Sequence, residues 1–320
     1  MTVVAVDVRE LGGEFALIDR IRRAPKNPNV LVGVGDDAAV LRLGSQSVVV
    51  TTDTLVEGDH FSLDYFTAKQ VGIKAMESNL SDVAAMGGTP LYALVALAMP
   101  KTVSVEWIDG FYDGLYASAS NADVDVVGGD TTHSNQVTVT LTLIGKAGNN
   151  LCLRSAAKPG DRIFVTGSLG ASTAGLKLFQ KKVPGFKSVK KKHVEPKSRL
   201  DVSPQIAEFA HAMEDVSDGL ASEVRNIALA SNMGAVIDAS AIPIDLETKK
   251  AADELGDDAL DYALFGGEDF ELVFTVALKD QKKAERFGTC VGHIMDGEGV
   301  FLEKNGRRER LSRFGFDHFA

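Results

Sequence analysis

The residues of this chain best suited to binding a charged ligand are acidic residues, most of them close to glycine. Glycine beside a carboxylate lets the backbone approach a ligand closely and permits positive φ angles. Any one of these acids would fit an ordinary turn, and capping of a helix near Gly219 would explain Asp218 alone. Their recurrence favours a shared function. The six clusters are Asp36–Asp37 after Gly33-Val34-Gly35, Asp53 after Thr51 and Thr52, Asp82 after Asn79-Leu80-Ser81, Asp130 after Gly128–Gly129, Asp215 and Asp218 around Ser217, and Glu268–Asp269 after Gly266–Gly267.

Carboxylates that converge require cations, because like charges packed together without partners are costly. Hard oxygen ligands select magnesium or calcium over zinc, and magnesium commonly joins a few carboxylates to phosphate oxygens. The chain has no calcium-binding loop of the D-x-D-x-D-G form. The acidic clusters therefore predict a site for a magnesium-bound phosphate.

The familiar phosphate-transfer motifs are missing from the sequence. It contains neither G-x-x-x-x-G-K-[ST] nor the catalytic-loop motifs of protein kinases. The segment from Gly167 to Gly170 follows a predicted strand and is a weak candidate for a phosphate-binding loop. Arg154 is suited to bidentate binding of a phosphate, although a surface arginine is equally compatible with its local sequence. No Ser/His/Asp or Cys/His arrangement indicates a nucleophile.

Strands and helices alternate irregularly along the chain. The sequence predicts an α/β or α+β protein, not a regular doubly wound sheet. The polar segment Lys146 to Asn150 favours a boundary near residue 148, giving domains 1–148 and 149–320. Strands are predicted at 47–54, 124–127, 137–144, 162–166 and 270–276, and helices near 68–86, 104–119, 171–181, 204–213 and 219–231.

Composition limits the class of partner. The 320 residues carry a formal net charge of -10, so a nucleic-acid partner is not expected. The dense basic run is 181–197, interpreted as a solvated loop, with a lid over anionic substrate as the alternative.

There are only two cysteines, Cys152 and Cys290. The apolar run 91–99 is too short to cross a membrane, and the first residues do not resemble a signal peptide. We expect a cytoplasmic protein with no membrane contact.

The motifs, taken in order, resemble those of the thiamine-monophosphate kinase family, part of an ATP-binding superfamily with aminoimidazole ribonucleotide synthetase and selenophosphate synthetase. One such motif is weak evidence, but the ordered set is specific and covers nearly the whole chain. The matching segments are Gly13-Glu14, GVGDDAAV (33–40), TTDTLVEGDHF (51–61), NLSDVAAMGG (79–88), GGDTTHS (128–134), RSAAKPGD (154–161), VTGSLGAS (165–172), DVSDGL (215–220), GGEDFELVFT (266–275) and GFDHF (315–319).

The resemblance implies direct transfer of the ATP γ-phosphoryl group to thiamine monophosphate, giving thiamine diphosphate. It also implies an N-terminal sheet domain that dimerises into a barrel and a C-terminal α/β domain, hence a homodimer. Positions that match the family's functional residues are Asp37, Thr51, Thr52, Asp53, Asp82, Asp130, Asp215 and Asp218 for several Mg²⁺ ions; Tyr112, Gly129, Asp130, Arg154 and Ser217 for ATP; and His60, Glu268 and Phe316 for substrate.

Two other functions remain open at this point. One is a related superfamily enzyme such as aminoimidazole ribonucleotide synthetase, which the segments TTDTLVEGDHF and GFDHF fit poorly. The other is a non-catalytic sensor of magnesium-bound nucleotide, which loss of a metal carboxylate would indicate. The sequence departs from the family pattern at Ala157, Thr173 and Glu77, none of which matches a ligand position.

Overall fold

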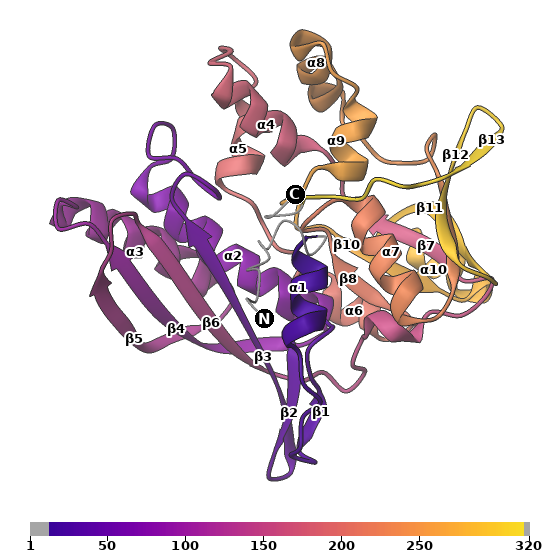
Figure 1. Ribbon diagram of the computed structural model, residues 1–320, viewed down its shortest axis with the longest axis horizontal. Helices are drawn as coiled ribbons and strands as arrows, with labels where there is room; N and C mark the ends of the chain where they lie inside the picture. Colours follow the sequence, from indigo (N-terminus) through magenta and orange to yellow (C-terminus); the bar gives the residue numbers. More distant parts are fainter. Residues whose placement is uncertain (1–12, 317–320) are drawn as a thin grey trace, which may run out of the picture.

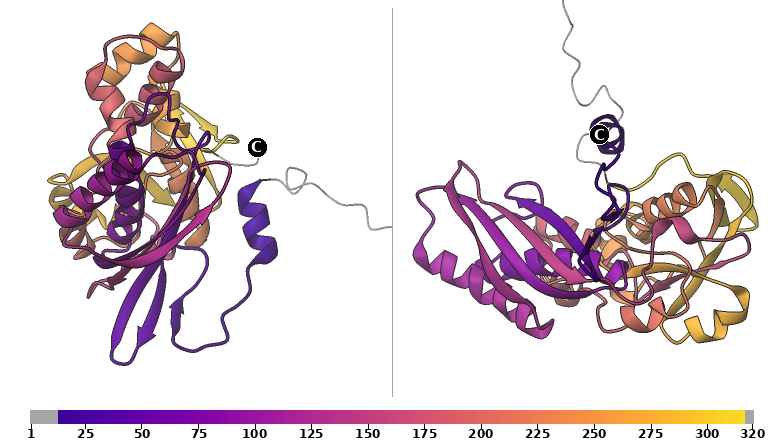
Figure 2. Two further views of the ribbon diagram at one scale, coloured as in Figure 1. Left: turned by 90° about the vertical axis from the view of Figure 1, so that its left-hand side faces the viewer. Right: turned by 90° about the horizontal axis from the view of Figure 1, so that it is seen from below.

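Residues 13–316, which the computed structural model describes, form two β-sheets with helices packed around them (Figure 1). The first sheet has the strand order β1-β2-β3-β6-β4-β5, and the second has the order β13-β12-β9-β11-β7-β10-β8. Seen from below, the two sheets lie in neighbouring lobes (Figure 2, right). Both sheets mix parallel and antiparallel pairs, which confirms the predicted mixed α/β class.

The elements of the first lobe alternate between strands and two long helices. They are α1 (Glu14–Ile21), β1 (Val30–Val32), β2 (Ala39–Leu43), β3 (Gln46–Val56), α2 (Ala68–Ala85), β4 (Thr89–Met99), α3 (Val105–Asn121), β5 (Asp125–His133) and β6 (Thr138–Lys146).

The second lobe contains shorter helices. Its elements are η2 (Arg154–Ala156), β7 (Arg162–Thr166), α4 (Ala171–Gln180), α5 (Lys187–Val194), α6 (Ser203–Ala207), β8 (Met213–Asp215), α7 (Leu220–Ala230), β9 (Gly234–Asp238), α8 (Leu246–Leu255), α9 (Ala259–Phe265), β10 (Leu272–Val276), η3 (Leu278–Asp280), α10 (Gln281–Ala284), β11 (Gly288–Met295), β12 (Gly299–Lys304) and β13 (Arg307–Arg310).

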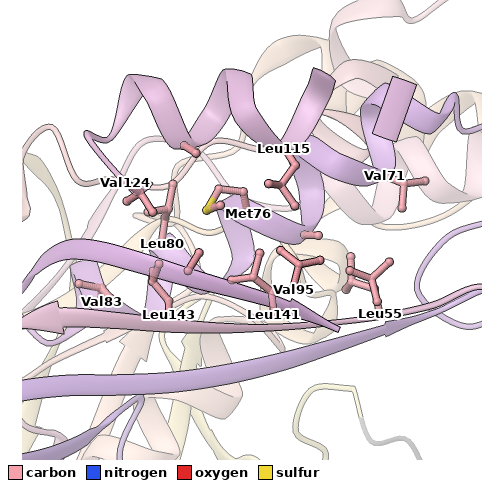
Figure 3. Close-up of a cluster of buried hydrophobic side chains, with 14 of the residues drawn as sticks. Leu55, Val71, Met76, Leu80, Val83, Val95, Leu115, Val124, Leu141 and Leu143 are labelled. Carbon is pink, nitrogen blue, oxygen red and sulfur yellow. The ribbon is translucent and has the colours of Figure 1, made fainter. Parts of the chain in front are cut away.

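The first sheet buries one face under α2 and α3 (Figure 3). Strand β6 shows why: its apolar residues alternate with threonines, so Leu141 and Leu143 point to the covered side and are almost fully buried. They meet Met76 and Leu80 of α2 in one core. This packing fixes the position of α2 relative to β3. Each of these two elements carries an acidic residue of the candidate site, Asp82 in α2 and Asp53 in β3.

Two glycines let α2 and α3 touch backbone to backbone. A Cβ on Gly72 would lie 2.0 Å from the carbonyl oxygen of Phe111, and one on Gly114 would lie 1.9 Å from that of Lys69. Neither position therefore accepts a side chain without a shift of a helix. The contact fixes the position of α2 along α3.

The two lobes share a core at the end of α2. Ala84 and Ala85 pack in one buried cluster with Phe164 and Phe274 of the second sheet and Ile206 of α6. The other face of the second sheet is covered by a separate cluster that includes residues of α7 and α9. The C-terminal end of α2 is thus held against β8, which brings two acidic segments together.

Several predicted elements are confirmed with small changes in length. The helices expected near 68–86, 104–119 and 171–181 are α2, α3 and α4, and the strand expected at 162–166 is β7. The strands expected at 47–54 and 124–127 continue further, as β3 and β5. Asp53 and Asp130 therefore lie within strands, where the sequence favoured strand ends or loops.

The helix predicted at 204–213 is wrong over its second half. Helix α6 ends at Ala207, and Met213 begins strand β8. Met213 pairs with Phe274 of β10 and is fully buried, so a distant strand determines its conformation.

The interpretation of 181–197 as a solvated loop is also wrong. Lys187–Val194 is helix α5. Val189, His193 and Val194 are buried on one side of it, while most of its lysines lie on the other. The basic character therefore marks the outer face of a packed helix.

The first sheet ends with β6 at Lys146 and the second begins with β7 at Arg162. We propose that the domain boundary lies near residue 148, as predicted. Among the residues that the structure describes, no helix has the length and apolar character needed to cross a membrane.

Candidate active site

Three carboxylates from distant segments converge between the lobes. Ligand oxygens of Asp37, Asp82 and Asp215 all lie within 4.8 Å of one another. Asp37 precedes β2, Asp82 lies near the end of α2, and Asp215 ends the short strand β8. We refer to Asp37, Asp82 and Asp215 as the carboxylate cluster.

Neighbouring side chains hold the cluster in place. The Thr51 hydroxyl lies 2.5 Å from Asp82 Oδ2, and the Ser81 hydroxyl donates to Asp215 Oδ2 at 2.6 Å. Arg154 contacts Asp37 through one terminal nitrogen, which also lies 2.9 Å from Glu214 Oε1. Each acid therefore has a polar neighbour, and Arg154 supplies the positive charge.

Burial raises the pKa of every carboxyl group of the cluster. For Asp215 the pKa rises to about 8, because of desolvation and then the charge of Asp37. The pKa of Asp82 is raised well above its ordinary value by burial, with Asp53 as the next cause. The buried oxygens Asp37 Oδ2 and Glu214 Oε2 have no hydrogen-bond partner among the described residues. Arg154 alone does not balance the charge of these buried carboxyl groups, so the arrangement suits a further cation.

Asp53 connects the cluster to an open cavity. Its carboxyl group is close enough to Asp82 to raise the pKa of that acid, while burial raises the pKa of Asp53 itself and Ser78 beside it partly offsets the rise. The cavity has a volume of about 410 Å³. Its lining includes Glu14, Asp53, Asp59, His60, Ser78, Ser172, His193, Ser217, Asp218, Phe265, Gly267, Glu268, Phe270 and Phe316.

The structure places the three predicted substrate contacts around this cavity. His60, Glu268 and Phe316 all line it, together with Ser217 and Asp218. Phe316 is 52% exposed, and its backbone N–H donates to the Asp218 carbonyl at 3.3 Å. The remainder of the predicted GFDHF segment, 317–319, lies outside the described residues.

Thr52 does not direct its side chain toward the cluster. Thr51 is buried and Thr52 is exposed, because successive residues of β3 face opposite sides of the sheet. The Thr52 hydroxyl donates to the Leu141 carbonyl at 3.1 Å and contacts Thr142. The side chains of Thr51 and Thr52 therefore point to opposite faces of the sheet, and the assignment of Thr52 as a metal ligand stays a prediction.

Three predicted nucleotide positions lie apart from the cluster. Asp130 and Gly129 are exposed on β5, the edge strand of the first sheet. A Cβ on Gly129 would lie 1.8 Å from the Val95 carbonyl, so the close approach of β4 explains this glycine. Tyr112 packs against the core of the first lobe beside Phe111 and does not line the cavity.

Two loops expected to bind ligands are capped from within the protein. Glu223 Oε1 accepts the backbone N–H groups of Ser217, Asp218 and Gly219. Helix α7 begins at Leu220 without a side-chain cap, so N-capping does not explain Asp218.

Asp269 accepts the N–H groups of Gly170 and Ser172 at 2.5 and 3.1 Å. The Asp269 carboxyl group therefore already accepts the backbone N–H groups at the start of α4 that a phosphate would use. The interpretation of 167–170 as a phosphate-binding loop is not supported.

Sequence reasoning missed several residues of the site. Lys74 and His193 meet Glu268 beside the cavity, and Glu214 supplies a second partner of Arg154. A lysine on the apolar side of a predicted helix was the available signal for Lys74. The departure at Glu77 also has a role, because Glu77 accepts two hydrogen bonds from Ser198, each 2.8 Å long.

Two family models match the chain in tandem. "AIR synthase related protein, N-terminal domain" matches residues 35–147, and "AIR synthase related protein, C-terminal domain" matches residues 158–302.

Curated relatives and a solved structure match nearly the full length. Thiamine-monophosphate kinase of Bacillus subtilis is 38% identical over 327 residues, covering 96% of this chain and 99% of its own. That of Buchnera aphidicola from Schizaphis graminum is 37% identical, covering 96% and 98%. A structure of AaThiL complexed with AMPPCP and TMP superposes with a TM-score of 0.89 at 32% identity, covering 98% of this chain and 99% of that chain.

Proposed function

Because this chain belongs to the thiamine-monophosphate kinase family of AIR synthase related proteins, we propose that it phosphorylates thiamine monophosphate with ATP. The product is thiamine diphosphate, so the protein is an enzyme of thiamine diphosphate synthesis. The transferred group is the γ-phosphoryl group, and its acceptor is itself a phosphate.

The observation that carries this proposal is a single site assembled from both lobes. The carboxylate cluster lies beside a cavity that Asp53, His60, Glu268 and Phe316 line. A cavity of about 410 Å³ suits a small molecule. A lining that includes acids, an aromatic ring and a hydrogen-bond acceptor suits a phosphate ester of an amino-substituted heteroaromatic ring.

The cofactor we assign is Mg²⁺, in several ions. Asp37, Asp53, Asp82 and Asp215 are the residues that would hold it, with Thr51, Thr52, Asp130 and Asp218 as the remaining positions that the resemblance implies. All are hard oxygen ligands, which suit magnesium. When bound, magnesium neutralises phosphate charge and aligns the reacting oxygens.

No side chain is required as a general base. The second pKa of a phosphate monoester is about 6, so the acceptor is already an oxyanion at pH 7. The protein therefore has to position two anionic groups and balance their charge. Arg154 supplies fixed positive charge beside Asp37, and the buried acids supply cation ligands.

Among the substrate contacts, we propose that Phe316 stacks on a ring of thiamine monophosphate and that Glu268 accepts hydrogen bonds from its aminopyrimidine. His60 lines the same cavity. Of the proposed nucleotide contacts, Ser217 lines the cavity and Arg154 lies beside the carboxylate cluster. The assignments of Tyr112, Gly129 and Asp130 to ATP rest on the family resemblance.

We also propose that the protein is a cytoplasmic homodimer. The open face of the first sheet exposes Tyr92 and Leu94, 46% and 37% exposed, on strand β4. A second copy packed on this face would cover them. Cys152 and Cys290 are both free, in keeping with a reducing compartment.

The proposed activity is tested by incubating the protein with thiamine monophosphate, ATP and magnesium and separating the products by chromatography. We expect equal amounts of thiamine diphosphate and ADP, with none formed in the presence of excess chelator. Turnover of the aminoimidazole ribonucleotide synthetase substrate would favour that related activity. Binding of magnesium-bound ATP without any product would favour a sensor.

Metal-free protein is expected to lose stability as the pH rises. Asp36 and Asp215 have pKa values raised to about 7 and about 8, mainly by burial, so the folded state holds these protons more tightly than the unfolded chain. Stability is then greatest at low pH within the folded range and falls as the pH passes from about 4 through 8. Thermal unfolding at pH 5.5 to 8.5 measures this.

Magnesium is the control for this pH dependence. Saturating magnesium should raise the melting temperature most at the high end of the range, because the ionised acids then have a cation. A metal-free melting temperature that rises toward pH 8, with no response to magnesium, would contradict the assigned metal site.

A further inference from the structure

Lys74 is a buried cation beside the cavity. It lies in the middle of α2, and its side chain is 0% exposed. Its ammonium nitrogen is 2.6 Å from Glu268 Oε1 and 2.8 Å from the carbonyl oxygen of His60. It also lies 5.4 Å from the centre of the Phe66 ring. A lysine is almost never buried completely unless it is paired, so its contacts indicate a specific role.

Glu268 is the partner that reaches the ligand. Its side chain is 28% exposed and lines the cavity, while Oε1 contacts Lys74. Its backbone has a φ of 64°, uncommon for a residue other than glycine, and its N–H donates to the Ser217 carbonyl at 2.8 Å. The second oxygen, Oε2, lies 3.6 Å from His193 Nδ1, longer than a hydrogen bond. Glu268 thus retains an acceptor that its partners among residues 13–316 do not fully use.

The remaining groups around Glu268 leave Lys74 as the main source of positive charge. Burial, followed by the charge of Lys74, lowers the pKa of His193 to about 3, so this imidazole is neutral at pH 7. Its Nδ1 lies 3.1 Å from the Ser172 hydroxyl. The other titratable groups facing Glu268 are His60 and Tyr65, and Glu14, Asp59 and Asp218 line the same cavity. Burial alone would raise the pKa of Glu268, but its surroundings lower the pKa, with the charge of Lys74 as the largest of the lowering effects.

We propose that Lys74 is a positioning and specificity-determining residue that keeps Glu268 ionised and aimed at the cavity. This proposal rests on the proposed function, in which Glu268 receives N–H groups of the aminopyrimidine ring. An ionised acceptor forms stronger hydrogen bonds than a neutral one, and a fixed one loses less entropy on binding. Lys74 therefore acts on substrate affinity through Glu268 and has no contact with the phosphates.

The test compares Lys74→Met, Glu268→Gln and the double variant with the native protein. In Lys74→Met, Glu268 stays partly buried without its cation, so its pKa rises and part of it is protonated at neutral pH. We expect the KM for thiamine monophosphate to rise at least about tenfold, in line with the loss of a charged hydrogen bond. The KM for ATP and the kcat should change less than about threefold.

The pH profile separates this role from a structural one. The ratio of the Lys74→Met KM to the native KM should fall between pH 6 and pH 9, because Glu268 regains its charge as the pH rises. Glu268→Gln and the double variant have no carboxyl group at this position, so their ratios should stay flat and agree within about twofold. The double variant also removes both buried charges, which preserves a folded protein if Lys74→Met unfolds.

Lys177→Met is the matched control, because Lys177 pairs with Asp257 outside the cavity. It should leave the KM for thiamine monophosphate unchanged. A pH-independent ratio for Lys74→Met, or a double variant clearly worse than Glu268→Gln, would overturn the role of Lys74. A native protein that forms no thiamine diphosphate would instead overturn the proposed function, and the inference with it.

Discussion

Replacing Asp53 with asparagine is expected to lower kcat by about 10³-fold or more while the protein stays folded. Asp53 lies at the junction of the carboxylate cluster and the cavity. Asparagine has nearly the same shape as aspartate, but it is a much weaker cation ligand. Turnover at saturating magnesium and circular dichroism together measure the effect.

The same substitution should stabilise the metal-free protein. Burial and the charge of Asp37 both raise the pKa of Asp53, so the ionised acid is disfavoured where it lies. A neutral amide removes that cost, and the melting temperature without magnesium should rise. Asp113→Asn, on the exposed face of α3, is the matched control and should change neither property. More than a tenth of native turnover in Asp53→Asn would contradict the assigned role.

Replacing Arg154 with methionine is expected to lower the free energy of unfolding by about 3–5 kcal/mol without magnesium. Its guanidinium group is the positive partner of Asp37 and Glu214, whose side chains are each 2% exposed. Removing it leaves two buried carboxyl groups without a positive partner. Urea-induced unfolding measures the loss, and magnesium should restore part of it because Asp37 then regains a cation.

Arg308→Met is the control for that measurement. Arg308 forms an ion pair with Glu303, but both side chains are about half exposed, so the pair is worth at most about 1 kcal/mol. A loss in Arg154→Met no larger than in this control would show that Arg154 does not balance the buried acids.

The sequence was sufficient to select the acids of the cluster but not to locate them. Asp37, Asp82 and Asp215 stood out by their neighbours, yet they lie in a loop, a helix and a strand. Their convergence depends on the packing of Ala84 and Ala85 against the second lobe, a contact between distant segments. Local periodicity contains no information about such contacts. At the sequence level, only the resemblance to a family grouped these three acids as ligands of the same kind of ion.

The errors have distinct physical causes. Alternation along β3 already places the side chains of Thr51 and Thr52 on opposite faces of the sheet, so that signal was present in the sequence. Lys74 was missed because an isolated lysine in a helix is normally exposed, and its partner Glu268 is far away in the chain. Met213 was assigned to a helix because its strand exists only through pairing with β10. Tertiary contacts decided the last two cases.

Direct transfer between the two substrates is the central claim, and a single-turnover reaction with γ-³²P-labelled ATP tests it. The native enzyme, in excess over labelled ATP, is mixed with thiamine monophosphate and magnesium and quenched at successive times. We predict that label passes from ATP to thiamine diphosphate in one phase, with no labelled protein. Label appearing first on the protein, or released as inorganic phosphate without thiamine diphosphate, would contradict it.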